Sequence, residues 1–127
     1  MYHYKARIEN VVDGDTVDAF VDLGFKTWVK IRFRLTGLDA AEKNTPRGIA
    51  TLNILKAIEG KDVFIESTRP DKYGRYLAEI WSPTANDYSY NYQLIRAGIV
   101  KPYHGDSRSE LWTAEELADG SIWVDLI

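Results

Sequence analysis

The chain contains no cysteine among its 127 residues, and this absence excludes disulfide bonds, thiolate metal sites and a cysteine nucleophile. Histidine is nearly as scarce: only His3 and His104 are present, too few for a histidine-rich metal centre. Any chemistry of the chain must therefore rest on its carboxylates and arginines.

Long apolar runs are also missing from the sequence. No segment approaches the ~18–20 consecutive apolar residues that are needed to cross a membrane. Residues 1–7 have neither the apolar core nor the small-residue cleavage site of a signal peptide. We therefore expect a cytoplasmic protein without a membrane partner.

The residues that are present suit one folded domain over residues 1–127. Hydrophobic residues make up 45% of the chain and charged residues 28%, far from the composition of disordered proteins. The net charge of −3 is uneven, since residues 104–127 hold six acids and one base, whereas residues 1–103 hold 13 acids and 15 bases. We expect an acidic C-terminal helix and tail at residues 105–127, and the remainder leaves room for a basic face.

The first part of the chain has the alternating pattern of β-strands. Residues 4–12 and 16–21 are rich in β-prone side chains, and residues 13–15, Asp-Gly-Asp, have the composition of a tight turn. Residues 28–35 alternate apolar with basic side chains until Gly37 interrupts the pattern. These patterns predict three consecutive antiparallel strands.

The remaining chain is predicted to contain three helices and two further strands. The helices are expected at residues 46–58, at residues 90–97, and from a capping box at Ser107 and Glu110 to residue 119. The first helix carries Ile49, Leu52, Leu55 and Ile58 at helical spacing. The strands are expected at residues 62–66 and 76–81. Together the elements predict an α+β fold that is mainly β, a five-stranded Greek-key barrel of the OB type with about three helices.

Four carboxylates and two arginines lie at or near the predicted turns and strand ends. A hard divalent cation such as calcium prefers oxygen ligands, so two carboxylates, a backbone carbonyl and water could hold it beside a substrate phosphate. Arginines could hold the same phosphate through paired hydrogen bonds, and another carboxylate could deprotonate a water molecule. The residues are Asp13, Asp15, Asp39, Glu42, Arg34 and Arg75.

Each of these features also has a purely structural interpretation. Asp-Gly-Asp is common in plain turns. Asp39 and Glu42 are placed where acidic residues stabilise the start of a helix, and arginines on a strand usually face solvent. No single feature is therefore specific for a catalytic site, and only their combination can be.

Three segments of the sequence together resemble a known family. VVDGDTV at residues 11–17, FRLTGLDAAE at residues 33–42 and DKYGRYLA at residues 71–78 are similar, in this order, to the signature segments of the staphylococcal nuclease (thermonuclease) family. The similarity covers residues 8–103 and includes LIRAGIVK at residues 94–101. The resemblance implies an OB-fold and calcium-dependent hydrolysis of phosphodiester bonds in DNA, RNA or both.

The same resemblance implies a calcium site. The ion would be held by Asp15, Asp39 and the backbone carbonyl of Ala40, and Asp13 would support these ligands from the next layer of residues. Family members usually have a proline before the glutamate of the second segment, whereas this chain has Ala41 there. The loop therefore lacks a residue that restricts its backbone.

Catalytic and substrate-binding roles follow from the resemblance in the same way. Glu42 would be the general base, and Arg34 and Arg75 would hold the scissile phosphate. The sequence differs from the family in one respect, since the hairpin around residues 23–28 is longer than in the family's secreted member. The residues expected to contact the nucleotide are Lys72, Tyr73 and Tyr103.

Two functions are consistent with these observations. The first is a monomeric, calcium-dependent endonuclease. The family's chemistry requires five charged residues, namely two metal-binding aspartates, a general base and two arginines, and all five are present together. The second is a catalytically weak or inactive OB-fold module that binds nucleic acid or a protein partner. The aromatic residues available for such binding are Trp28, Phe33, Tyr73, Tyr76 and Tyr103. A calcium-dependent nicking assay separates the two functions.

Overall fold

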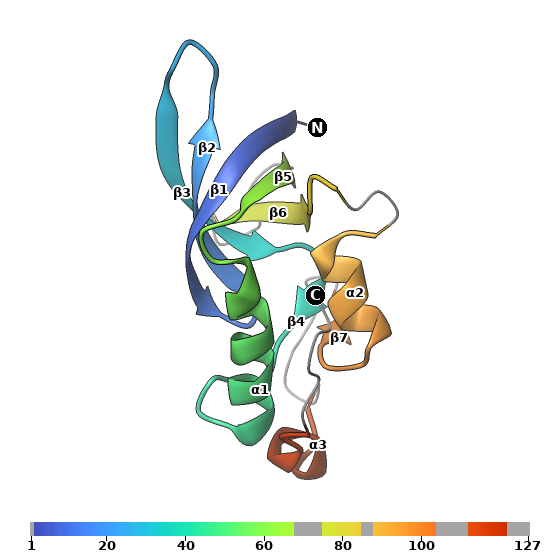
Figure 1. The fold of residues 1–127 in the computed structure, drawn as a ribbon. Helices are drawn as coiled ribbons and strands as arrows, with labels where there is room; N and C mark the ends of the chain where they lie inside the picture. Colours follow the sequence, from blue (N-terminus) through green and yellow to red (C-terminus); the bar gives the residue numbers. More distant parts are fainter. Residues whose placement is uncertain (1, 68–74, 85–87, 104–111, 122–127) are drawn as a thin grey trace.

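A computed structural model describes residues 2–67, 75–84, 88–103 and 112–121. Five strands close into a barrel with the neighbour order β1-β2-β3-β6-β5 (Figure 1). They are β1 (Tyr2–Asp13), β2 (Thr16–Asp22), β3 (Trp28–Leu35), β5 (Asp62–Ser67) and β6 (Tyr76–Trp81). The prediction of a five-stranded barrel in a mainly β fold is therefore confirmed.

Mixed strand pairing closes the barrel. β1, β2 and β3 form the predicted antiparallel meander, and β5 pairs antiparallel with both β1 and β6. β3 and β6 run parallel and pair only between residues 33–35 and 76–78. The connection from β3 to β5 contains β4 (Leu38–Asp39) and helix α1 (Pro46–Leu55), which extends away from the barrel in Figure 1.

Inward-facing side chains of the strands fill the barrel. On β3, Phe33 and Leu35 are almost fully buried, whereas Lys30 and Arg32 are exposed. Burying one large apolar side chain contributes about 1.5–3 kcal/mol, so these inward rows stabilise the fold strongly. Other buried apolar residues are Ile8, Val17, Ala19, Leu38, Leu55, Ile58, Ile65, Ile80 and Leu94.

Helix α1 begins where the sequence predicts and buries Leu55 of the predicted apolar stripe, but the first turn differs from the prediction. The Thr45 hydroxyl caps the helix by accepting a hydrogen bond from the Gly48 N–H (3.1 Å), and a 3-10 turn, η1 (Lys56–Ile58), completes the predicted stretch. Ile49 has the helical spacing of Leu52, Leu55 and Ile58, yet its side chain is 49% exposed. Gly48 and Thr51 are buried instead, because the small glycine lets the preceding loop pack against this side of the helix.

Helix α2 (Tyr90–Arg96) is tied to the barrel by a buried asparagine. The helix is capped by Ser89 and ends at Arg96, one residue before the predicted end. Asn91 donates from Nδ2 to the carbonyl oxygens of Thr36 (3.0 Å) and Ala78 (3.0 Å) and accepts from the Ile80 N–H (3.1 Å). The Ala78 carbonyl also accepts a hydrogen bond from the Thr36 N–H (2.8 Å), so Asn91 completes the pairing of backbone groups at this junction.

Helix α3 (Ala114–Ala118) begins later than the sequence predicts. Its capping box is formed by Thr113 and Glu116, which exchange side-chain and backbone hydrogen bonds. The predicted capping box at Ser107 and Glu110 lies outside the described residues. A short sheet of β4 and β7 (Lys101–Pro102), which was not predicted, also forms near this end of the chain. No helix in the described part of the chain is long and apolar enough to cross a membrane.

Candidate active site

The turn between β1 and β2 places two aspartates against helix α1. Asp13 Oδ1 accepts a hydrogen bond from the Gly14 N–H (2.7 Å). Gly14 is buried, and a Cβ atom at this position would lie 2.8 Å from Thr51 Cγ2 and 2.9 Å from Ala40 Cβ. Glycine is therefore required for this close approach, which fixes Asp15 beside residue 40.

Asp15, Arg34 and Asp39 form a buried ionic cluster. The β2–β3 register pairs Thr16 with Arg34, which brings the arginine next to Asp15. The guanidinium of Arg34 donates from Nη1 to Asp15 Oδ2 (3.0 Å), and from Nη2 to Asp39 Oδ1 (3.3 Å) and the Leu38 carbonyl (3.1 Å). All three side chains are more than nine-tenths buried. The structure thus brings together three of the residues that the sequence singles out.

Ala40 and Asp13 lie beside this ionic cluster. The Ala40 N–H donates to Asp15 Oδ2 (3.2 Å), so the backbone at this position contacts the aspartate directly. Burial raises the pKa of Asp13, the hydrogen bond from Gly14 lowers it, and the nearby charge of Asp15 raises it further, for a net increase. Negative charge is crowded at this turn, and a bound cation would relieve that crowding.

Trp112 contacts the ionic cluster from a distant part of the chain. Its indole Nε1–H donates to Asp39 Oδ2 (3.0 Å), while Arg34 donates to the other oxygen of the same carboxylate. Both oxygens of Asp39 are therefore held in place. Sequence analysis missed Trp112 because it is 73 residues from Asp39 and no local motif marks it.

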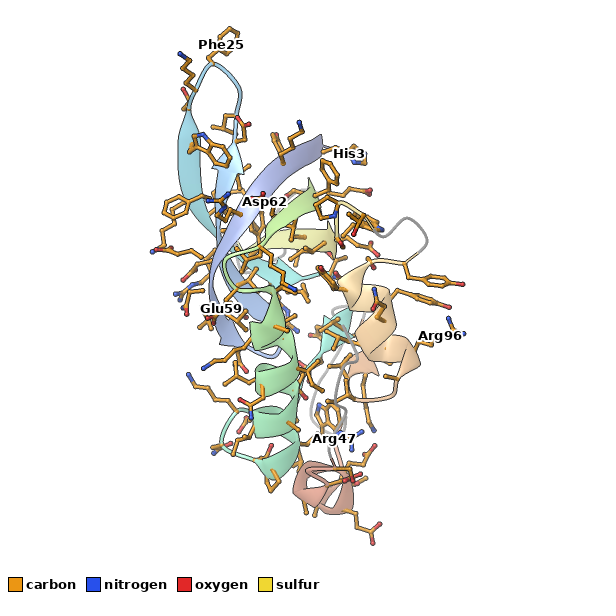
Figure 2. The ribbon with its side chains drawn as sticks, in the orientation of Figure 1. His3, Phe25, Arg47, Glu59, Asp62 and Arg96 are labelled. Carbon is orange, nitrogen blue, oxygen red and sulfur yellow. The ribbon has the colours of Figure 1, made fainter. Side chains whose placement is uncertain are left out.

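Two basic residues fix the segment that carries Trp112. Arg47 Cζ lies 5.3 Å and Lys101 Nζ 5.2 Å from the centroid of the indole ring, within the range of cation–π attraction. Arg47 also donates to the Gly98 carbonyl (2.6 Å), between α1 and the chain after α2 (Figure 2). Lys101 forms a salt bridge with Glu116 (2.7 Å), and the pKa of Glu116 falls to about 2, chiefly because of this bond.

A pocket of about 250 Å³ opens beside the ionic cluster. Three arginines contribute to its lining, and their guanidinium groups suit an anion with several oxygens, such as a phosphate. Arg75 is exposed, and the ring centroid of Tyr103 lies 5.6 Å from Arg34 Cζ. The lining residues are Thr16, Arg32, Arg34, Arg75 and Tyr76.

Glu42 lies on the loop before α1 with its side chain exposed to solvent. Thr45 donates from its N–H (3.0 Å) and its hydroxyl (2.6 Å) to the Glu42 carbonyl, so the backbone here is fixed. Among the described residues, the Glu42 carboxylate makes no hydrogen bond to the ionic cluster. Lys72 and Tyr73 lie outside the described residues.

The donor atoms of the ionic cluster suit a hard cation. Asp15 and Asp39 converge on one guanidinium, and both supply carboxylate oxygens, which calcium prefers. No three Asp, Glu or His side chains in the described ranges are close enough to hold a metal ion by themselves. A cation at this site would need backbone, water or substrate oxygens to complete its coordination, as is usual for an open catalytic site.

Comparisons with known proteins agree with these features. The model of the family described as "Staphylococcal nuclease homologue" matches residues 32–121. An uncharacterized endonuclease from Escherichia coli is 30% identical over 98 residues, which cover 76% of this chain and 60% of the relative. A probable staphylococcal-like nuclease from Oryza sativa subsp. japonica is 33% identical over 102 residues, which cover 75% of this chain and 26% of the relative.

An archaeal relative is similar over most of the chain as well. An uncharacterized protein from Methanocaldococcus jannaschii is 30% identical over 129 residues, which cover 80% of this chain and 60% of the relative. The chain therefore spans about 60% of the length of this relative and of the bacterial one.

Proposed function

The chain belongs to the staphylococcal nuclease family, and from this membership we propose that it is a calcium-dependent endonuclease that hydrolyses phosphodiester bonds of DNA, RNA or both. The observation that carries the proposal is the contact of one buried guanidinium, that of Arg34, with two buried aspartates beside an arginine-lined pocket. The names of the bacterial and plant relatives, an endonuclease and a nuclease, support the same reaction class.

Asp15 and Asp39 are the residues that would hold the calcium ion. The backbone carbonyl of Ala40 would add a third oxygen, and Asp13 would support the site from the neighbouring turn. Bound there, calcium would polarise a phosphate oxygen and offset the negative charge that grows on the phosphate oxygens during attack. Trp112 contributes indirectly, since it holds the Asp39 carboxylate through Oδ2.

Arg34 and Arg75 would bind the scissile phosphate. Both line the pocket, and a planar guanidinium donates paired hydrogen bonds to two phosphate oxygens. The contacts of Arg34 with two aspartates fix the plane of its guanidinium before substrate arrives. Such preorganised donors stabilise the additional negative charge of the transition state.

Glu42 would be the general base. Its exposed position gives its carboxylate access to water, and the Thr45 hydrogen bonds hold its backbone at the start of α1. The carboxylate would take a proton from water as the water oxygen attacks phosphorus and the bond to the leaving oxygen breaks. Lys72, Tyr73 and Tyr103 would contact the nucleotide.

The proposal is tested by incubating plasmid and single-stranded DNA and RNA with the protein in calcium, in magnesium and in chelator. We expect cleavage with calcium, slower cleavage with magnesium, which prefers a more rigid octahedral shell, and none with chelator. Undiminished cleavage in chelator would contradict the metal assignment. Binding of nucleic acid without cleavage in any condition would favour the non-catalytic module instead.

A further inference from the structure

The hairpin of β2 and β3 extends beyond the rest of the barrel, at the end opposite α3 (Figure 1). Its tip carries Phe25, which is fully exposed and points away from the molecule (Figure 2). The exposed large apolar side chains of this hairpin are Phe20, Leu23, Phe25, Trp28 and Val29. Such a concentration of exposed apolar side chains on one projection indicates an interaction surface.

The backbone at the tip is unusual for the residues that occupy it. Phe25 and Lys26 have φ values of 55° and 59°, in the left-handed region that bulky residues rarely adopt. The turn is closed by hydrogen bonds from Leu23 N–H to the Thr27 carbonyl (2.9 Å) and from Thr27 N–H to the Gly24 carbonyl (2.9 Å). Because Phe25 buries no surface in the fold, packing does not compensate for its strained backbone, and contact with a ligand provides a reason for it.

The hairpin is also basic, although the chain as a whole is acidic. Residues 16–35, which form the hairpin, contain four bases and two acids, whereas the net charge of the chain is −3. Lys30, Arg32 and Arg34 alternate along β3, so they share one face of the strand with Trp28. This face leads directly to the candidate active site, because Arg32 and Arg34 both line the pocket.

Two of these bases have acidic partners on the neighbouring strands β2 and β1. Arg32 donates from Nε (2.8 Å) and Nη2 (3.1 Å) to the two carboxylate oxygens of Asp18, and Lys30 forms a salt bridge with Glu9 (2.9 Å). The side chains of Arg32 and Lys30 are more than half exposed in these pairs. The exposed pair of Lys30 and Glu9 contributes little net energy, so a phosphate can compete for Lys30. The Asp18 side chain is only 8% exposed, so Arg32 keeps its pair with Asp18 and offers a phosphate the remaining N–H groups of its exposed guanidinium.

From these observations we propose that the face of Trp28, Lys30 and Arg32, together with the tip residue Phe25, forms a binding track for a nucleic-acid strand that leads into the active-site pocket. Phosphates would contact Lys30 and Arg32, and bases would stack on Trp28 and Phe25. Trp28 and Arg34 are six residues apart, about 20 Å along a strand, so the track spans several nucleotides. The inference rests on the proposed nuclease function in one respect, which is that the bound nucleic-acid strand continues from the hairpin into the active-site pocket.

A single-stranded nucleic acid fits this surface better than other partners. Strand-binding proteins combine a row of positive charges with aromatic side chains on which successive bases stack, and both occur here on one face. A membrane or a protein partner would use the apolar tip, but neither would account for basic residues that continue into the pocket. Capture by anionic vesicles and self-association are therefore included as alternative outcomes.

The direct test measures the affinity for a fluorescein-labelled oligothymidylate of about 20 nucleotides by fluorescence anisotropy, in chelator so that no cleavage occurs. Phe25→Asn places a residue that tolerates the left-handed region at the tip, so the variant is expected to fold at least as well as the wild type. We expect its affinity to fall about tenfold, and that of Trp28→Thr by a similar factor, as is typical when a stacking partner is lost. The matched control is Phe64→Thr, which removes a partly exposed phenylalanine from β5 and should bind like the wild type.

A second comparison tests the basic residues. The variant with both Lys26→Gln and Lys30→Gln should bind more weakly and lose part of the salt dependence of binding. The control with Lys56→Gln and Lys61→Gln changes the net charge equally, away from the hairpin, and should lose neither. Equal affinity of all hairpin variants and the wild type would overturn the inference. The inference would also be overturned if the hairpin variants kept their affinity for the oligonucleotide and lost only binding to anionic vesicles or only self-association.

Cleavage kinetics separate this inference from the proposed function. The ratio of kcat/KM for the long oligonucleotide to kcat/KM for a dinucleotide should fall about tenfold in Phe25→Asn and stay constant in Phe64→Thr. If the wild type cleaves neither substrate, the nuclease function fails, but the binding assay still decides whether the track exists. If cleavage occurs and the ratio does not change, the track is wrong while the nuclease function stands.

Discussion

At the scale of single residues, Arg34 links the stability of the fold to the chemistry of the site. Its guanidinium contacts Asp15 and Asp39, and all three side chains are buried. Removing one partner of a buried ion pair leaves an uncompensated charge and typically costs about 3–5 kcal/mol. The same arginine would also meet the phosphate, so substitutions here should change stability and activity together.

Replacing Arg34 by lysine tests this double role. A lysine keeps the positive charge but lacks the planar fork that reaches both aspartates. For Arg34→Lys we expect the free energy of unfolding to fall by about 1–3 kcal/mol and the cleavage rate to fall by about 100-fold or more. Urea denaturation and initial rates of oligonucleotide cleavage measure the two effects.

The matched control for this variant is Arg7→Lys. Arg7 forms an exposed salt bridge with Asp62 (3.0 Å), and exposed pairs contribute little. We expect Arg7→Lys to change the free energy of unfolding by less than about 0.5 kcal/mol. If Arg34→Lys were equally mild, Arg34 would be only a structural charge.

Trp112 provides a second prediction at this scale. Trp112→Phe keeps an aromatic ring near Arg47 and Lys101 but removes the hydrogen bond to Asp39 Oδ2. Because that bond holds a proposed calcium ligand, we expect calcium affinity, measured by titration calorimetry, to fall about tenfold, with a loss of stability of about 1–2 kcal/mol. Trp81→Phe, on β6 and outside the site, should bind calcium like the wild type, and equal affinity of both variants would exclude a positioning role for Trp112.

At the scale of elements, helix α1 and the loop before it fit together through Gly48. A Cβ atom at this position would overlap the carbonyl group of Glu42 and crowd the carbonyl oxygen of Ala41. In an ordinary helical position, replacing glycine by alanine stabilises a protein by about 0.5–1 kcal/mol. We expect the opposite sign for Gly48→Ala, a loss of about 1–3 kcal/mol, together with slower cleavage, because the loop that carries Glu42 must move.

The control for this prediction is Asn53→Ala, an exposed position of the same helix. Alanine has the higher helix propensity, so Asn53→Ala should be neutral or slightly stabilising and should leave cleavage unchanged. Both variants are compared by urea denaturation and by cleavage rates. A stabilised and fully active Gly48→Ala protein would show that the loop does not depend on this contact.

The stability that Glu116 contributes at helix α3 is expected to depend on pH. The pKa of Glu116 is lowered from 4.5 to about 2 by its bond with Lys101 and by the capping bond from Thr113. A carboxyl group with a lowered pKa in the folded state contributes stability that is complete above the unfolded pKa and is lost as the pH falls through the folded pKa. We therefore expect stability from this contact to decline between pH 4.5 and about 2.

Glu116→Gln should remove that part of the pH dependence. The free energy of unfolding of the variant and the wild type should differ at neutral pH and converge near pH 2. The variant Glu115→Gln, at the exposed neighbouring position, should keep the wild-type profile. Parallel curves for Glu116→Gln and the wild type over the whole range would show that the Lys101 bond does not contribute.

Local patterns predict the elements of this fold better than its long-range contacts. Alternation of side chains is sufficient to find β1, β2 and β3, and their register then places Arg34 beside Asp15. The exposure of Ile49 could not be predicted, because it depends on how the loop packs against Gly48. The start of α3 is hard to predict because two segments, one at Ser107 and one at Thr113, have the composition of a capping box, and only the second lies in the described residues.

At the scale of the whole molecule, the barrel joins a buried ionic cluster to an exposed basic hairpin. β3 connects the two, since Arg34 lies in the cluster and Trp28 lies on the projecting part of the same strand. The motifs in the sequence identify Asp15, Arg34 and Asp39, because each belongs to a local segment. Trp112 could not be found in this way, because its contact with Asp39 depends on the path of the whole chain.

The most direct measurement of the proposed function is the single-turnover cleavage rate of a labelled oligonucleotide by Asp15→Asn in saturating calcium. Asparagine has nearly the same shape and can still accept the Ala40 hydrogen bond, but it removes a charged ligand of the proposed calcium site. Thermal unfolding of the variant establishes that it is folded. We predict that the folded variant has no detectable calcium-dependent cleavage, whereas a rate close to that of the wild type would contradict the assignment of this cluster as the catalytic site.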